Sequence, residues 1–100
     1  MGVKLVWGEA AMNDLEELAA YIAEDSEQNA RLVEARIHAS AKLLLVLPGA
    51  GRPGRVSGTR EWVILRTPYI LVYRLDSETV RVLRLYHGAR RWPSSFPGGS

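Results

Sequence analysis

His87 is the residue of this sequence best suited to general acid–base chemistry. It lies at the end of an expected strand, next to Tyr86, and Arg90 and Arg91 follow closely. A histidine at a strand end also commonly serves in packing or hydrogen bonding, so both roles stay open at this stage. His38, the other histidine, falls inside an expected helix and is interpreted as structural or solvated.

Arginine dominates the basic residues, because eleven of the thirteen are arginine, the side chain suited to planar, bidentate contact with carboxylate or phosphate. Six of them lie on or beside expected strands: Arg60, Arg66, Arg74, Arg84, Arg90 and Arg91. Since strand residues alternate between faces, the six cannot all converge, but a subset can. Such a subset could bind RNA phosphate or an acidic protein surface, or stabilise a phosphorane-like transition state without metal. Alternatively, each arginine extends from the sheet edge into solvent.

The net charge of +2 conceals two halves of opposite sign. Residues 9–34 include eight acidic residues and one basic residue, a net charge of −7. From residue 36 onward, eleven basic and three acidic residues give +8, and Lys4 supplies the remaining charge. This distribution suggests an anionic partner for the second half, although a solvated arginine-rich surface would give the same count.

Length and composition exclude several classes of protein. One hundred residues, 47% of them hydrophobic, suffice for one core but not for two. The absence of cysteine excludes disulfide scaffolds and thiolate metal sites, and two histidines argue against a histidine-rich zinc site. The sequence has no P-loop, no paired carboxylate in the strand half and no serine near His87. It therefore gives no support for a hydrolase or a nucleotide-binding protein. Because no segment approaches the roughly 20 apolar residues of a membrane span, we expect a cytoplasmic protein. Without cysteine or a P-loop, we expect neither a metal nor a cofactor.

Hydrophobic periodicity predicts a strand followed by two helices. Val3–Trp7 is β-branched and aromatic, which is typical of a strand. Residues 9–24 repeat apolar side chains at helical spacing, and Asp25-Ser26 offers a cap for a second helix that ends before Pro48. The second helix carries an apolar stripe at Val33, Ile37, Ala41 and Leu44 and a flanking one at Ala35, Ala39, Leu43 and Val46.

The second half of the chain begins with a loop and continues as strands. Pro48–Gly58 contains four glycines and two prolines, so we expect an exposed basic loop without regular structure, carrying Arg52 and Arg55. Three β-rich runs bounded by turn signals follow, at residues 61–66, 69–75 and 80–87. Residues 69–73 are apolar on both faces, which predicts the central strand.

These elements predict an α+β fold in the order β-α-α-β-β-β, a helical hairpin packed on a small antiparallel sheet. We expect Trp62 and Tyr73 between the helices and the sheet. Trp92 and Phe96 lie next to prolines and are candidates for contact with a partner. Residues 1–93 are expected to form a single domain, and residues 94–100, with the sequence SSFPGGS, a flexible tail.

Several strings, in this order along the chain, resemble the RelE/ParE toxin superfamily. They are GRPG at 51–54, GTRE at 58–61, PYILVYR at 68–74 and HGARRWP at 87–93. The similarity runs from about Val3 to Pro93. Members are toxins of bacterial type II toxin–antitoxin modules. The resemblance therefore implies a helical hairpin on an antiparallel sheet, and a cognate antitoxin that covers the apolar surface with an amphipathic segment and neutralises the basic side.

The resemblance leaves two activities to choose between. RelE-like members cut mRNA in the ribosomal A site without metal, and ParE-like members poison DNA gyrase. The positions that carry RelE-like cleavage correspond in this chain to Glu61, Val63, Ile70, Arg90 and, approximately, Phe96. Only Arg90 keeps the basic character that a cleavage site requires. Some relatives use a terminal His-Tyr pair or a glutamate, so a different constellation of Tyr86, His87 and Glu61 stays open.

We therefore expect a ParE-like toxin that inhibits growth by binding DNA gyrase and stabilising its cleaved DNA complex, with no catalytic residue of its own. The residues expected to contact the target are Arg52, Arg55, Arg84, Arg90, Arg91 and Trp92. The alternative is a ribosome-dependent mRNA endonuclease that uses Arg60, His87 and Arg90. A third hypothesis is a non-toxic relative that acts only as an interaction partner. The residues that contact the antitoxin are not assigned.

Overall fold

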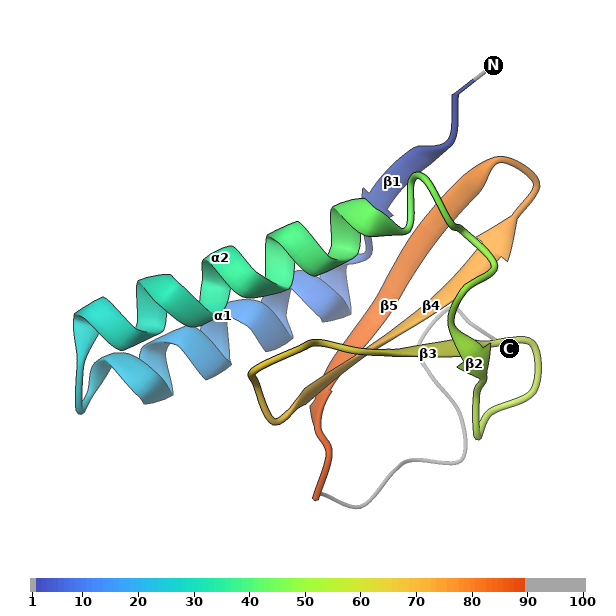
Figure 1. Ribbon diagram of the computed structural model, residues 1–100. Coiled ribbons are helices and arrows are strands. Elements are labelled where there is room, and N and C mark those ends of the chain that lie inside the picture. Colours follow the sequence, from blue (N-terminus) through green and yellow to red (C-terminus); the bar gives the residue numbers. More distant parts are fainter. Residues whose placement is uncertain (1, 90–100) are drawn as a thin grey trace.

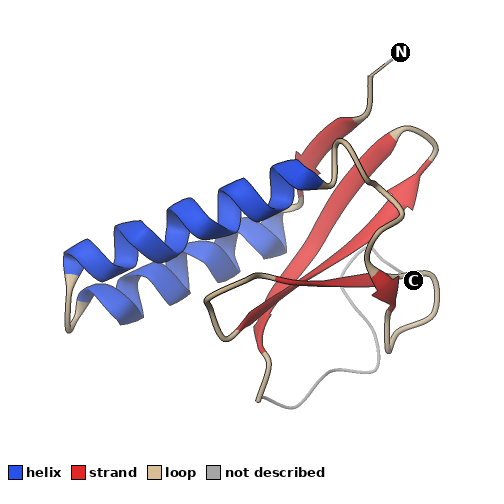
Figure 2. Cartoon of the chain, in the orientation of Figure 1, coloured by secondary structure: helices blue, strands red, loops and turns tan. Residues whose placement is uncertain are grey.

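A helical hairpin covers one face of a five-stranded sheet in the computed structural model of this protein, which describes residues 2–89 (Figures 1 and 2). The elements are β1 (Lys4–Trp7), α1 (Glu9–Ala23), α2 (Glu27–Leu43), β2 (Arg52–Pro53), β3 (Arg60–Val63), β4 (Tyr69–Asp76) and β5 (Thr79–His87). The predicted α+β class and the order β-α-α-β-β-β are confirmed, with β2 as one additional short strand. The predicted boundary at residue 93 lies outside the described residues.

The α2 helix begins where the sequence predicts. Ser26 is extended and its hydroxyl accepts a hydrogen bond from the backbone N–H of Asn29 at 3.1 Å, which satisfies one of the unpaired donors of the first turn. The predicted stripe at Val33, Ile37, Ala41 and Leu44 is buried. The flanking stripe is not covered by the sheet: Val46, for example, is 76% exposed, because the hairpin turns only one face of α2 toward the strands.

The sheet order is β1-β5-β4-β3-β2, which places β4 at the centre as predicted. The pairs β2–β3, β3–β4 and β4–β5 are antiparallel, as expected for a meander. The first strand differs, because β1 pairs with β5 in parallel, with Lys4 opposite Thr79 and Trp7 opposite Val82. The sheet is therefore mixed. The two helices between β1 and β5 in the sequence form the crossover that a parallel pair requires.

Two expectations for the region 48–66 are wrong. The Pro48–Gly58 segment contains a strand after all, because Arg52 and Pro53 pair with Glu61 and Arg60. The strand expected over 61–66 ends at Val63. A turn follows there, in which the backbone N–H and the hydroxyl of Thr67 both donate to the carbonyl of Ile64, at 3.3 and 2.9 Å.

The two faces of the sheet have different surroundings. Leu71 and Tyr73 belong to the same buried cluster as Ile37 and Ala41 of α2, so they mark the face that the helices cover. Trp62 also faces α2, and its indole N–H donates to the carbonyl of Ser40 at 3.0 Å, in agreement with the predicted positions of Trp62 and Tyr73.

Strand alternation puts Ile70 and Val72 on the opposite face, together with their partners Val63 and Glu61 on β3. We call this side of the sheet the distal face. No helix within residues 2–89 has the length and apolar character needed to cross a bilayer.

Candidate functional site: the basic loop and the distal face

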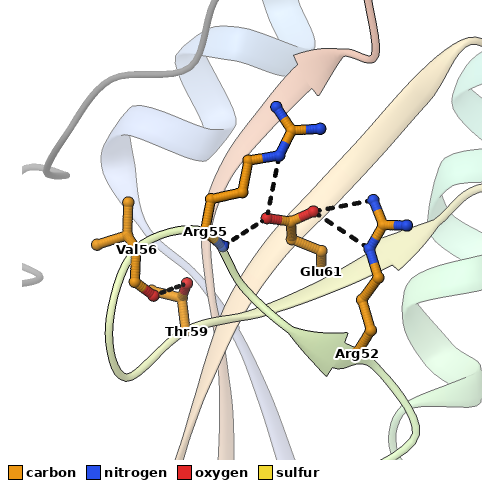
Figure 3. Close-up of polar contacts among 5 residues, drawn as sticks. All are labelled: Arg52, Arg55, Val56, Thr59 and Glu61. Atoms are coloured by element: carbon orange, nitrogen blue, oxygen red, sulfur yellow. Dashed lines mark hydrogen bonds and ion pairs between the residues drawn. The ribbon is translucent and has the colours of Figure 1, made fainter.

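Glu61 on β3 organises the basic loop, Pro48–Gly58. One carboxylate oxygen, Oε1, accepts from Nε and Nη2 of Arg52 at 3.3 and 3.0 Å. The other, Oε2, accepts from the backbone N–H of Arg55 at 2.8 Å and lies 3.8 Å from Nε of that arginine. Figure 3 shows the two arginines on either side of the carboxylate. The sequence-predicted target residues Arg52 and Arg55 are thus brought together.

The carboxylate of Glu61 is almost completely buried, whereas the two arginine side chains remain about half exposed, at 55% for Arg52 and 49% for Arg55. An ionised carboxylate can be withdrawn from water in this way when both oxygens are hydrogen-bonded and a counter-charge is adjacent. Two guanidinium groups and one carboxylate leave this cluster with a net charge of +1. The site therefore presents the positive charge of two arginines to solvent, and the buried carboxylate of Glu61 holds them in place.

A second set of contacts fixes the start of the same loop to the core. The hydroxyl of Tyr73 donates to the carbonyl of Pro48 at 2.7 Å and accepts from the backbone N–H of Gly51 at 2.9 Å. Burial raises the pKa of the Tyr73 phenol, and the Gly51 N–H and the charge of Arg60 offset part of that rise. The loop path from Pro48 to Gly51 is therefore set by a side chain from the central strand.

Arg60, a residue of the alternative catalytic set, serves the same loop. Its Nη1 donates to the carbonyls of Gly51 and Gly49, at 2.8 and 3.2 Å. Arg60 pairs with Tyr73 on β4, whereas His87 pairs with Tyr69, four residues earlier along that strand. At about 3.4 Å per residue, the two are offset by about 14 Å along the strand direction. The structure does not bring Arg60 and His87 together.

His87 is held by local contacts. Its Nδ1 accepts the backbone N–H of Ala89 at 3.2 Å, and its ring packs edge-on against Tyr69 with 5.6 Å between centroids. These contacts match the packing and hydrogen-bonding role that the sequence left open. Arg90, which completes the alternative set, lies outside the described residues, as do Arg91, Trp92 and Phe96.

Arg84 is engaged away from the basic loop. Its Nε and Nη2 donate to the two carboxylate oxygens of Asp14 on α1, at 2.6 and 3.0 Å. The hydrogen bond to Asp14 raises the pKa of Arg84, against the opposing effect of burial. The guanidinium also lies 4.9 Å from the ring centre of Tyr86. The structure therefore joins this arginine to α1, and not to the Arg52–Arg55 pair.

Three positions that the resemblance matched to RelE-like cleavage positions lie together on the distal face. Glu61 and Val63 are two residues apart on β3, and Ile70 pairs directly with Val63. Tyr86 pairs with Ile70 on the other side, whereas His87, one residue later, belongs to the opposite face. The three positions therefore form one site, but their side chains are two aliphatic groups and a carboxylate that is hydrogen-bonded to two arginines. Among residues 2–89, no three acidic or histidine side chains are grouped to hold a metal ion.

Sequence comparison identifies the family. Residues 5–92 match the family described as the ParE toxin of type II toxin–antitoxin system, parDE. The chain belongs to the ParE toxin family. It is also 39% identical over 90 residues to the curated protein "Putative toxin Y4kP" of Sinorhizobium fredii strain NBRC 101917 / NGR234, a match that covers 90% of this chain and 93% of the relative.

Solved structures of ParE-like and RelE-like systems share the fold. The chromosomal ParDE toxin–antitoxin system from P. aeruginosa matches with a TM-score of 0.76 and 26% identity, over 85% of this chain and 95% of that chain. The toxin–antitoxin complex RelBE2 from Mycobacterium tuberculosis matches with a TM-score of 0.63 and 26% identity, over 87% and 99% of the two chains. A two-helix hairpin on a sheet is therefore the architecture of this ParE family member and of these relatives.

The roles of Glu61, Asp14 and Tyr73 in this ParE family member are not apparent from sequence. Glu61 is an acid in a strand with arginines nearby in the sequence, which is a weak signal for an ion pair. Asp14 is separated from Arg84 by 70 residues, and nothing in the pattern of α1 distinguishes it from the acids around it. These three residues were found because the fold places them against their partners.

Proposed function

We propose that this ParE family toxin acts by binding DNA gyrase and stabilising its cleaved DNA complex, without a catalytic centre of its own. The observation that carries the proposal is the content of the distal face at Glu61, Val63 and Ile70. Cleavage of a phosphodiester needs positive charge around the scissile phosphate and a group that moves a proton. Two aliphatic side chains and a carboxylate engaged by arginines place neither a cation nor a free proton carrier at these three positions.

The basic loop is the proposed contact surface for the target. Arg52 and Arg55 are half exposed and held in one cluster of net positive charge, which suits recognition of an anionic surface. Arg90, Arg91 and Trp92 remain predicted contacts from the sequence. We assign Arg84 instead to the joint between α1 and β5, because its guanidinium is bound by Asp14.

A cognate antitoxin is the proposed natural partner, and the cytoplasm the proposed place of action. The family is defined by type II toxin–antitoxin systems, and both structural relatives are toxin–antitoxin systems. The exposed apolar side chains at the end of α2, such as Leu43 and Val46, are available to an amphipathic segment. An antitoxin that covers them would neutralise the toxin by occupying its surface.

The alternative function is a ribosome-dependent mRNA endonuclease. The similarity to RelBE2 supports this alternative, because its 26% identity equals that of the ParDE system. In that case His87 would have to act with groups other than Arg60, which is bound to loop carbonyls about 14 Å away from His87 along the strand direction.

Two assays on the purified toxin separate the functions. The first measures gyrase supercoiling and traps cleaved DNA complexes; the second maps cleavage of mRNA on translating ribosomes. We expect accumulation of cleaved gyrase complexes and intact mRNA. Cleavage of mRNA within ribosome-bound codons, with gyrase activity unchanged, would overturn the proposal.

Variants of the loop test which surface is used. Arg52→Ala removes an exposed guanidinium of the basic loop, and we expect it to weaken gyrase inhibition. Arg31→Ala is the matched control, because Arg31 is an exposed arginine on α2 with only a 3.9 Å contact to Glu27. Equal loss of inhibition in both variants would indicate an effect of overall charge and not of the loop.

A further inference from the structure

Glu61 is the only carboxylate-bearing residue classed as buried among residues 2–89, at 3% exposure. A buried charge is unfavourable unless hydrogen bonds and opposite charges compensate for its lost hydration. Arg52 and Arg55 of the basic loop supply this compensation (Figure 3). The chain therefore places its most buried acid directly beneath the two arginines that the proposed function uses.

Contacts other than those of the Glu61 carboxylate also hold the path of the loop. Tyr73 and Arg60 hold residues 48–51, and the backbone N–H of Gly54 donates to the carbonyl of Thr59 at 2.7 Å. The hydroxyl of Thr59 closes the tip by donating to the carbonyl of Val56 at 2.6 Å. Glu61 adds something different, because it is the group that receives the guanidinium of Arg52 and sets its direction.

We infer that Glu61 is a positioning residue of the target-binding site, which orients Arg52 so that this guanidinium can bind an acidic side chain on the surface of the target protein. The inference rests on the proposed function and deepens it. Nε and Nη2 of Arg52 point to Oε1, so the direction of the planar group is set before the target arrives. Preorganisation of this kind reduces the entropy lost on binding.

An acidic protein side chain fits this cluster better than a nucleic-acid backbone does. The cluster has a net charge of +1, and its arginine already takes a carboxylate as ligand. Binding to a phosphate backbone draws on many cations at once, and a buried carboxylate at the centre of the cluster works against it. One local positive charge with a fixed orientation suits a single carboxylate on a protein surface.

Charge and orientation predict opposite results for Glu61→Gln. Removing the carboxylate charge raises the net charge of the cluster from +1 to +2. If only positive charge mattered, this variant would bind an anionic target more tightly. If Glu61 acts by orienting Arg52, the same variant binds more weakly although the loop has become more basic.

The experiment compares Glu61→Gln, Arg52→Ala, the double variant and the control Arg31→Ala. Each is tested for inhibition of gyrase supercoiling and for growth inhibition after induction, with thermal unfolding and protein level measured in parallel. We expect Glu61→Gln to lose about tenfold or more in potency, as Arg52→Ala does. The double variant should lose no more than Arg52→Ala alone, because Glu61 acts through Arg52.

Three results would overturn the inference. They are unchanged or higher potency of Glu61→Gln, additive losses in the double variant, and binding of the wild type to short duplex DNA that Arg52→Ala removes, with DNA as the measured ligand. If Glu61→Gln does not fold, Glu61→Asp keeps the charge with a shorter reach and should show the same loss. Inactivity of the wild type toward gyrase would overturn the proposed target, whereas the growth assay would still decide the role of Glu61.

Discussion

Asp14 on α1 receives both the guanidinium of Arg84 and the backbone N–H of Leu85, the latter at 3.0 Å. β1 pairs with β5 only as far as Val82, so the backbone of β5 loses its strand neighbour beyond that residue. Beyond that point, the carboxylate of Asp14 accepts the backbone N–H of Leu85. One carboxylate thus joins the helical hairpin to the edge of the sheet.

We expect Asp14→Asn to lower the free energy of unfolding by about 2 kcal/mol, because it weakens a bidentate charged pair and a backbone hydrogen bond together. Urea unfolding measures the loss. Glu16→Gln, an exposed acid on the same helix, should change stability by less than about 0.5 kcal/mol. Similar losses in both variants would mean that general helix charge, and not the Asp14 contacts, stabilises the joint.

Gly51→Ala should destabilise the protein by about 1 to 3 kcal/mol, because the added methyl group overpacks the loop against the core. A Cβ at Gly51 would lie 2.7 Å from both Cε1 and Oη of Tyr73 and 3.0 Å from the carbonyl oxygen of Glu61. Gly49→Ala is the matched control, since a Cβ there meets nothing within 4 Å. Thermal unfolding of the two variants tests this, and equal midpoints would contradict it.

Tyr73→Phe should cost about 1 to 2 kcal/mol near neutral pH, because the Pro48 carbonyl and the Gly51 N–H lose their partner. The variant should also change the response to alkali. Burial raises the folded-state pKa of Tyr73 above its ordinary value of 10.0, so its contribution is complete below that pH and is lost as pH rises through the folded pKa.

Urea unfolding between about pH 9 and about pH 11 should therefore show a shallower alkaline loss for Tyr73→Phe than for the wild type. Some loss should remain, because burial also raises the pKa of Tyr86. Tyr21→Phe, at an exposed position on α1, serves as the control. A wild-type slope in Tyr73→Phe would show that this phenol does not titrate with unfolding.

His87→Phe should retain growth inhibition to within about twofold, because a ring is kept against Tyr69 and no proton transfer is required. Growth after induction is the measurement, with protein level as the check. Complete loss of toxicity in a variant that still folds would favour the endonuclease alternative, in which His87 moves a proton.

The sequence by itself determined the elements that depend on local pattern. The helical spacing of Val33, Ile37 and Ala41 predicts the buried stripe of α2, and Ser26 predicts its start, because a helix face and an N-cap are defined by neighbouring residues. The apolar run at 69–73 predicts the central strand for the same reason. The family resemblance on four short strings agreed with the fold class that these elements predict and added the toxin family.

Only the tertiary structure decided which charges meet. Asp14 and Arg84 are 70 residues apart, and their contact depends on β1 ending at Trp7 while β5 continues past it. Glu61 meets Arg52 because a two-residue strand forms in a segment too rich in glycine and proline to predict one. The sequence shows where the arginines lie along the chain. The register and the edges of the sheet arise from long-range packing, and they determine that Arg84 binds α1 whereas Arg52 and Arg55 bind Glu61.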